Sequence, residues 1–315
     1  LDDKSYLKST LITSGTDRGG EQSILDSEYS EIPEGNESYD QNKVALNTIY
    51  TRKINAKNSI KAGIIASMNF YDLEQSWRNE SGTSIETLIK QNGEAITLQS
   101  FAQWNFHPLE RLTIVTGLHY LAFTENNTFS IEPRASAKYN LNDKQSVSIG
   151  YGLHGQVQPL GVYFAQLNNS DGTIVMPNHD LGISKSHHFV VGYDRTITKY
   201  MHVKIEGYYQ SIFNVPVNAD ASKTFSMLNN EYGFVTDPLV NKGKGVNKGI
   251  ELTIEQYLHN DFYFLLSSSF YDSKYQTLSG KWFNTRFNGQ YATTFTGGKD
   301  FKTGPGFGNR IVGIN

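Results

Sequence analysis

Residues 146–154 read SVSIGYGLH, and this stretch decides the fold. The apolar residues Val147, Ile149, Tyr151 and Leu153 alternate with small or polar residues, which is a period of two. Neighbouring side chains of an extended strand point to opposite faces of the sheet. The stretch therefore predicts a β-strand with one apolar face and one polar face.

The same period recurs along almost the whole chain, and helical periodicity is hard to find. About twelve segments show it, and a thirteenth begins near Arg310. They lie near 5–14, 41–54, 58–73, 93–107, 111–125, 129–141, 145–157, 185–198, 201–215, 245–258, 261–276 and 283–296. A strand of a soluble protein has about 5–6 residues, whereas a tilted strand needs about 9–11 to cross a bilayer. Most of these segments are long enough to cross.

Composition excludes several classes of function. The 315 residues carry 28 Lys+Arg against 31 Asp+Glu, a net charge of −3, so we expect no nucleic-acid partner. The chain has no cysteine, which excludes disulfides, thiolate metal sites and cysteine nucleophiles. No nucleophile-elbow, zinc-protease or phosphate-loop motif occurs. We therefore expect neither an enzyme nor a cofactor.

The connections between the segments alternate between short and long. The long polar ones lie near 15–40, 74–92, 158–184 and 216–244. Alternation places every short turn at one rim and the longer loops at the other, as in outer-membrane barrels. We predict a single all-β domain over residues 1–315, part of an antiparallel up-and-down transmembrane β-barrel whose long loops are extracellular.

Many of the residues on the polar face of these strands are charged. In a lipid-embedded barrel the apolar face of each strand is turned to lipid and the polar face is turned to the lumen. The predicted lumen-facing residues are Lys61, Glu132, Arg134, Lys138, Lys204, Glu206, Glu251, Glu255 and Arg286. In the alternative interpretation, these charges lie on the solvent side of a soluble sheet.

Several stretches resemble the barrel of TonB-dependent outer-membrane receptors, especially the Bacteroidetes-type group. They lie at 154–164, 179–182, 186–194, 240–245, 249–252, 271–275, 284–289 and 298–301. The resemblance covers the chain from about residue 93 onward. Residues 1–92 fit by period and loop length only.

The resemblance implies a function and a setting. It implies TonB-driven uptake of a scarce nutrient (a siderophore, oligosaccharide, peptide or vitamin) across the outer membrane of a Gram-negative bacterium. The implied partners are TonB, the lipid bilayer and the nutrient, and a surface lipoprotein is left open. Such receptors are similar in having a plug and about 22 strands, so we expect this chain to be a barrel fragment without the plug.

Aromatic and amide residues in and beside the two later loops are the ligand-binding candidates, because rings and amides together suit sugars, peptides or chelates. They are Gln156, Gln158, Tyr163, Phe164, Gln166, Phe225, Asn229 and Tyr232. His154, His179, His187 and His188 lie around the first of these loops, but their spacing matches no recognised metal-ligand set, so we expect no metal site.

Two further interpretations stay open at the level of sequence. One is a passive porin or adhesin barrel that works without TonB. The other, less favoured, is a soluble all-β binding protein, such as a sandwich or a propeller.

Overall fold

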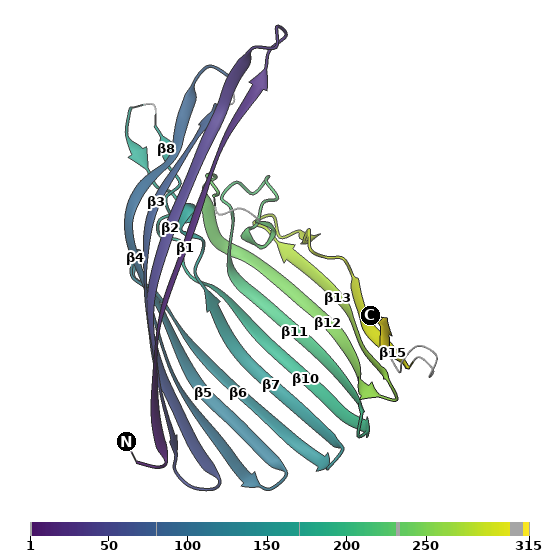
Figure 1. Cartoon of the computed structure of the whole chain (residues 1–315). Helices are drawn as coiled ribbons and strands as arrows, with labels where there is room; N and C mark the ends of the chain where they lie inside the picture. The colour runs from purple at the N-terminus through teal and green to yellow at the C-terminus, as the bar shows by residue number, and fades with distance from the viewer. Residues whose placement is uncertain (1, 80, 170, 231–233, 303–310, 315) are drawn as a thin grey trace.

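The computed structural model describes residues 2–79, 81–169, 171–230, 234–302 and 311–314, and most of them lie in long antiparallel strands (Figure 1). The strands before the first long loop are β1 (Ser5–Leu25), β2 (Glu31–Lys53), β3 (Asn58–Arg78), β4 (Ile85–Leu109), β5 (Leu112–Phe123), β6 (Thr128–Asn142) and β7 (Gln145–Gln156). The later strands are β8 (Leu167–Asn168), β9 (Ile174–Val175), β10 (Ser184–Thr198), β11 (Met201–Asn218), β12 (Leu239–His259), β13 (Phe262–Gln276), β14 (Trp282–Asn284), β15 (Tyr291–Lys302) and β16 (Ile311–Ile314).

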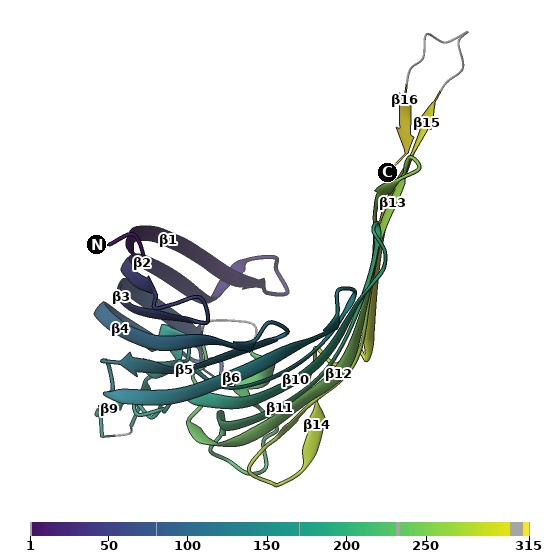
Figure 2. The same ribbon diagram turned by 90° about the horizontal axis from the view of Figure 1, so that it is seen from below.

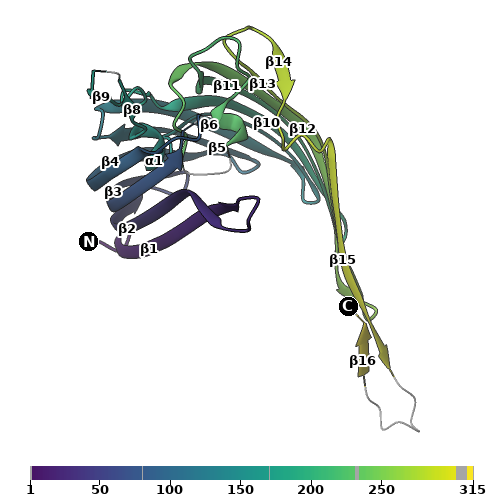
Figure 3. The same cartoon turned by 90° about the horizontal axis from the view of Figure 1, so that it is seen from above.

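The large sheet is strictly up-and-down. Its order is β1-β2-β3-β4-β5-β6-β7-β10-β11-β12-β13-β15-β16, and β14 pairs with β13 beside this path. Every pairing is antiparallel, for example β6 with β7 and β10 with β11. Viewed along the strands, the sheet curves into an open trough (Figures 2 and 3). The predicted all-β, up-and-down architecture is confirmed, while a total of 22 strands stays a prediction.

The convex face of the sheet is apolar and uncovered. Ile149 pairs laterally with Ala137 and Val191, and Ile250 pairs with Phe270 on the same face. Ile149 is 60% exposed, and Val191, Ile250 and Phe270 are similarly exposed. In the described residues no second sheet packs on this face, so the sandwich interpretation is not supported. A continuous exposed apolar face of this kind suits contact with lipid.

The connections sort between two rims, as predicted. Five tight turns connect β2 to β3, β4 to β5, β6 to β7, β10 to β11 and β12 to β13 at one rim (Figure 1). In the last of these, Asn260 and Asp261 have φ of 53° and 63°. Positive φ at both central residues matches the twist of a two-residue hairpin, and Asn and Asp tolerate it better than most residues. The connections from β1 to β2, β3 to β4, β5 to β6, β7 to β10, β11 to β12 and β13 to β15 lie at the other rim.

Two predicted loops are instead strands. Residues 15–40 were expected to form an open loop, but β1 and β2 pair as far as Leu25 and Glu31 and leave only residues 26–30 as a turn. Residues 74–92 likewise belong mostly to β3 and β4, with residues 79–84 between them. Both hairpins extend past the apolar band, where each face can be polar. The hydropathy alternation that identifies a half-buried strand therefore fades there.

The remaining differences are local. The segment expected at 283–296 divides into the short β14 and the longer β15, with a turn between them. Within the described ranges, helix is limited to α1 (Leu160–Tyr163) and the 3₁₀ turn η1 (Met227–Asn229). Among the described residues, neither helix has the length or the apolar character to cross a membrane.

Candidate functional site

The connection between β7 and β10, residues 157–183, folds inward against the wall of the trough. Its short helix α1 packs with Tyr71 and Leu73 of β3, Ile89 of β4 and Phe123 of β5 in one apolar cluster. The ring of Phe164 stacks on Tyr71 at 5.0 Å between centroids, and Tyr163 meets Phe123 at 5.1 Å. This connection is therefore a packed element, and Figure 3 shows α1 beside the sheet at the longer-loop rim.

Polar contacts fix the same connection to the wall. The backbone N–H of Gln166 donates to the carbonyl of Leu88 at 2.8 Å, and its side-chain amide donates to the carbonyl of Lys90 at 3.2 Å. The N–H of Gln158 donates to the hydroxyl of Tyr163 at 3.0 Å. Burial of this phenol raises the pKa of Tyr163 to about 12, because the anionic form would lose its hydration.

Four of the predicted ligand contacts are part of this packing. Tyr163 and Phe164 are buried in the apolar cluster, and Gln158 and Gln166 are buried by the contacts of the connection. In this structure the two rings pack on the inner wall, and contact of these four side chains with a ligand stays a prediction. Rings that look like free platforms in a loop sequence also suit a small core.

The other four predicted ligand-binding residues lie in different places. Phe225 packs against the edge of the same cluster. The side-chain oxygen of Asn229 accepts the backbone N–H of Arg286 at 3.0 Å. Gln156 is exposed and lines a hollow on the inner wall. Tyr232 lies outside the described residues.

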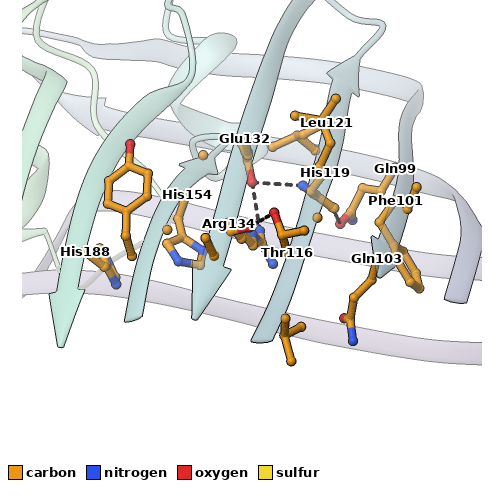
Figure 4. Close-up of a pocket in the computed structure, with 18 of the residues that line it drawn as sticks. Gln99, Phe101, Gln103, Thr116, His119, Leu121, Glu132, Arg134, His154 and His188 are labelled. Atoms are coloured by element: carbon orange, nitrogen blue, oxygen red, sulfur yellow. Dashed lines mark hydrogen bonds and ion pairs between the residues drawn. The ribbon is translucent and has the colours of Figure 1, made fainter. Parts of the chain in front are cut away.

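A hollow of about 880 Å³ lies on the concave face of β3 to β7 and β10. Figure 4 shows its lining. The charged side chains and imidazoles there are those of Lys61, His119, Glu132, Arg134, His154 and His188. We call this feature the basic hollow, because Glu132 is its only carboxylate.

Glu132 holds two neighbours in place at the back of the basic hollow. It is 1% exposed, and its Oε2 lies 2.8 Å from Nδ1 of His119 and 2.9 Å from a guanidinium nitrogen of Arg134. The other ring nitrogen of His119 lies 3.2 Å from the side-chain oxygen of Gln99. A Cβ at Gly155 would come 2.5 Å from Glu132 Oε1, so the glycine leaves room for the carboxylate. The pairing explains how a charged side chain can be buried there.

The histidines divide between the two faces of the sheet. His188 faces inward and its ring lies 4.5 Å from that of His154, whereas the adjacent His187 faces outward and stacks on Tyr151. His179 is in the loop, 3.3 Å from Asp180 and 3.7 Å from Glu125. In the part of the chain that the structure describes, no group of three or more His, Asp or Glu side chains is arranged to hold a metal ion.

A second hollow of about 500 Å³ lies further along the wall, on β10 to β13. Its lining includes the carboxylates of Glu206, Glu251 and Asp272 and the phenols of Tyr208 and Tyr271. Glu206 and Glu251 are direct register partners on β11 and β12. Lys204 lies 2.6 Å from Glu206 and offsets part of their repulsion. The inner wall therefore has a basic region and an acidic region.

The remaining predicted lumen residues lie near the tight-turn rim or off the strands. Lys138 pairs in register with Ser148, Lys204 with Asp194, and Glu255 with His202, all on the face that carries the hollows. Arg286 was expected on a strand, but it lies in the turn after β14. That turn begins where the short β14 ends, which the alternation of the sequence did not reveal.

Sequence reasoning missed His119, Gln99 and Gln103, which also line the basic hollow. A signal was available for His119, because the hairpin of β5 and β6 places it directly opposite Glu132. Predicting that His119 faces Glu132 requires the register of the hairpin, and the sequence of the turn at residues 124–127 is not sufficient to predict that register.

Comparison with known proteins identifies the family. The family model described as TonB dependent receptor-like, beta-barrel, matches residues 5–314. No curated protein matches the sequence. The fold is similar to that of the ferripyoverdine receptor of the outer membrane of Pseudomonas aeruginosa, with a TM-score of 0.66 and 14% identity over 95% of this chain and 42% of that one.

Two further solved structures share the fold. The ferric yersiniabactin uptake receptor FyuA from Yersinia pestis has a TM-score of 0.66 and 13% identity, over 96% of this chain and 46% of that one. The RagAB peptide transporter has a TM-score of 0.59 and 13% identity, over 96% and 39%. The chain thus spans less than half the length of these relatives. It belongs to the TonB-dependent receptor-like β-barrel family of the Gram-negative outer membrane.

Proposed function

We propose that the protein containing this chain is an outer-membrane receptor that takes up a scarce nutrient with energy delivered through TonB. The observation that carries the proposal is the family match over residues 5–314. This chain would supply part of the barrel wall and several extracellular loops. TonB would act on a segment of the protein other than the strands described above.

The inner wall supports this proposal. Two hollows on this wall are lined by polar and charged side chains, and the loop of residues 157–183 packs on the wall near the larger of the two. Separate recognition patches along a wall suit a receptor that binds a solute before passing it inward. A siderophore, a peptide, an oligosaccharide and a vitamin are all candidate nutrients, and a surface lipoprotein is a candidate partner.

Uptake in the native bacterium tests the proposal. One strain lacks the gene for this protein, a second lacks TonB, and a third lacks both. Accumulation of labelled ferric siderophores, peptides, oligosaccharides and vitamins is measured in each strain. We expect one nutrient to be lost equally in all three strains. Uptake that needs this protein but persists without TonB would contradict the proposal and favour a passive porin.

A further inference from the structure

The basic hollow contains a lateral row of inward-facing residues across six strands. Register pairs connect Lys61 of β3, Gln103 of β4, Gly117 of β5, Arg134 of β6, Gly152 of β7 and His188 of β10. Adjacent strands are about 4.8 Å apart, which places the backbones of Lys61 and Arg134 about 14 Å from each other. Both residues that flank Arg134 in this row are glycines. The imidazole of His154 lies over one of them, because a Cβ at Gly152 would come 2.6 Å from its Nε2.

The charge that this hollow presents to the lumen is positive. Glu132 is 1% exposed, and the oxygen that meets His119 also meets Arg134. Arg134 has a side-chain exposure of 44%, so the remainder of its guanidinium is open to the hollow. No ion pair involves Lys61 among the described residues. The one carboxylate of the hollow is thus covered, while both of its permanent cations are accessible.

Neutral donors complete the lining. The imidazoles of His154 and His188 lie beside each other, and the amides of Gln99, Gln103 and Gln156 also line the hollow. A guanidinium offers a planar fork of N–H groups that matches two oxygens of a carboxylate or phosphate. Ring N–H and amide N–H groups would add hydrogen bonds to the other oxygens.

We propose that the basic hollow binds an anionic group, a carboxylate or a phosphate, of the compound that the receptor takes up. The inference rests on the proposed function for the identity of the compound, but the hollow's preference for anions stands on its lining. Arg134 and Lys61 would contact the anion. Glu132 is a positioning residue that holds Arg134 and His119 from behind.

Isothermal titration calorimetry on the full-length receptor in detergent tests the proposal. The probes are citrate, inorganic phosphate and, as a cation of comparable charge, spermidine. The variants are Arg134→Gln and Lys61→Gln, and the second leaves the contacts of Glu132 undisturbed. Lys138→Gln is the matched control, because Lys138 lies on the same strand and face as Arg134 but outside the lining of the hollow.

We expect citrate or phosphate to bind about tenfold or more weakly to Arg134→Gln, because a charge-assisted hydrogen bond is lost. Lys61→Gln should weaken binding severalfold, and Lys138→Gln should leave it unchanged. Three results would overturn the proposal: equal anion affinity in all variants, a preference for spermidine, or a lower melting temperature of Arg134→Gln with unchanged affinity. The last would assign the hollow to contact with another part of the protein. The titration needs neither TonB nor a membrane gradient, so its outcome is separable from that of the uptake experiment.

Discussion

At the scale of a single residue, ionisation of the Tyr163 phenol is coupled to the packing of the loop of residues 157–183. The packed phenol has a pKa of about 12, whereas a solvated tyrosine has one of about 10. The packed loop therefore holds the phenol proton more tightly than the open loop does. Packing should be most stable below about pH 10 and should weaken as the pH rises from about 10 to about 12.

This pH dependence can be followed with a nitroxide label. The chain has no cysteine, so Asn168→Cys at the exposed β8–β9 hairpin provides one attachment site within it. We expect the label to become more mobile between about pH 10 and pH 12 in the otherwise unchanged protein. Tyr163→Phe should remove this pH dependence. It should also loosen the loop at neutral pH, because the N–H of Gln158 loses its acceptor at a cost of about 1–3 kcal/mol.

Tyr29→Phe is the control for general effects of alkaline pH, since Tyr29 is exposed. It should behave like the unchanged protein at every pH. A Tyr163→Phe variant that still loosens between the same pH values would show that another group controls the loop.

At the scale of elements, buried amides tie the two later loops to each other. Asn178 is fully buried; its amide nitrogen donates to the carbonyl of Asp237 at 2.9 Å, and its oxygen accepts the N–H of Leu239 at 2.8 Å. The partly buried Asn126, in the turn between β5 and β6, donates to the carbonyls of His179 and Leu181 and ties that turn to the first of the two loops. These contacts join segments about 60 residues apart and satisfy backbone groups that would otherwise be buried without partners.

Asn178→Ala should release both loops together. The substitution leaves the carbonyl of Asp237 and the N–H of Leu239 without this partner, at about 1–3 kcal/mol each. We expect faster amide hydrogen exchange in residues 157–183 and also in residues 234–239, measured by mass spectrometry on the full-length receptor. Asn140→Ala, at the opposite rim and exposed, should change neither segment. Faster exchange in only one of the loops would contradict the coupling.

For the whole molecule, the decisive property is that the two faces of one sheet meet different solvents. Ile149 is 60% exposed on the convex face, and the next strand places Ser136 on the concave face, opposite Gly150. Ile149→Lys should therefore cost about 2–4 kcal/mol in folding free energy if it lies near the bilayer midplane. Ser136→Lys should cost much less, because its ammonium would stay in the wet lumen.

Refolding of the full-length receptor into lipid vesicles at increasing urea, followed by the mobility shift of the folded barrel on gels, compares the two variants. A loss for Ile149→Lys that Ser136→Lys does not share is the expected result. Equal losses would mean that the convex face does not contact lipid, and the transmembrane assignment would then fail.

Much of the fold could be read from the sequence, but little of the site. The alternation that identified β7 and β10 also implies that adjacent His187 and His188 point to opposite faces, and the structure places His188 on the inner one. The same alternation placed Lys61, Glu132 and Arg134 on the polar face of their strands, and in the structure all three line one hollow. The loop side chains were harder, because Tyr163 and Phe164 carry no period that says whether they meet a ligand or the wall.

The sequence by itself determined the up-and-down sheet, its apolar and polar faces and the sorting of turns and loops. The two faces follow from a pattern of period two, which depends only on residues one or two positions apart. The sorting of turns and loops follows from the alternation of short and long connections along the chain. Only the tertiary structure decided that Tyr163 packs on Phe123, that β1 and β2 pair as far as the turn at residues 26–30, and that Glu132 is covered by His119 and Arg134. Those features depend on strand register and on contacts between distant segments, and neither can be predicted from the local hydropathy pattern.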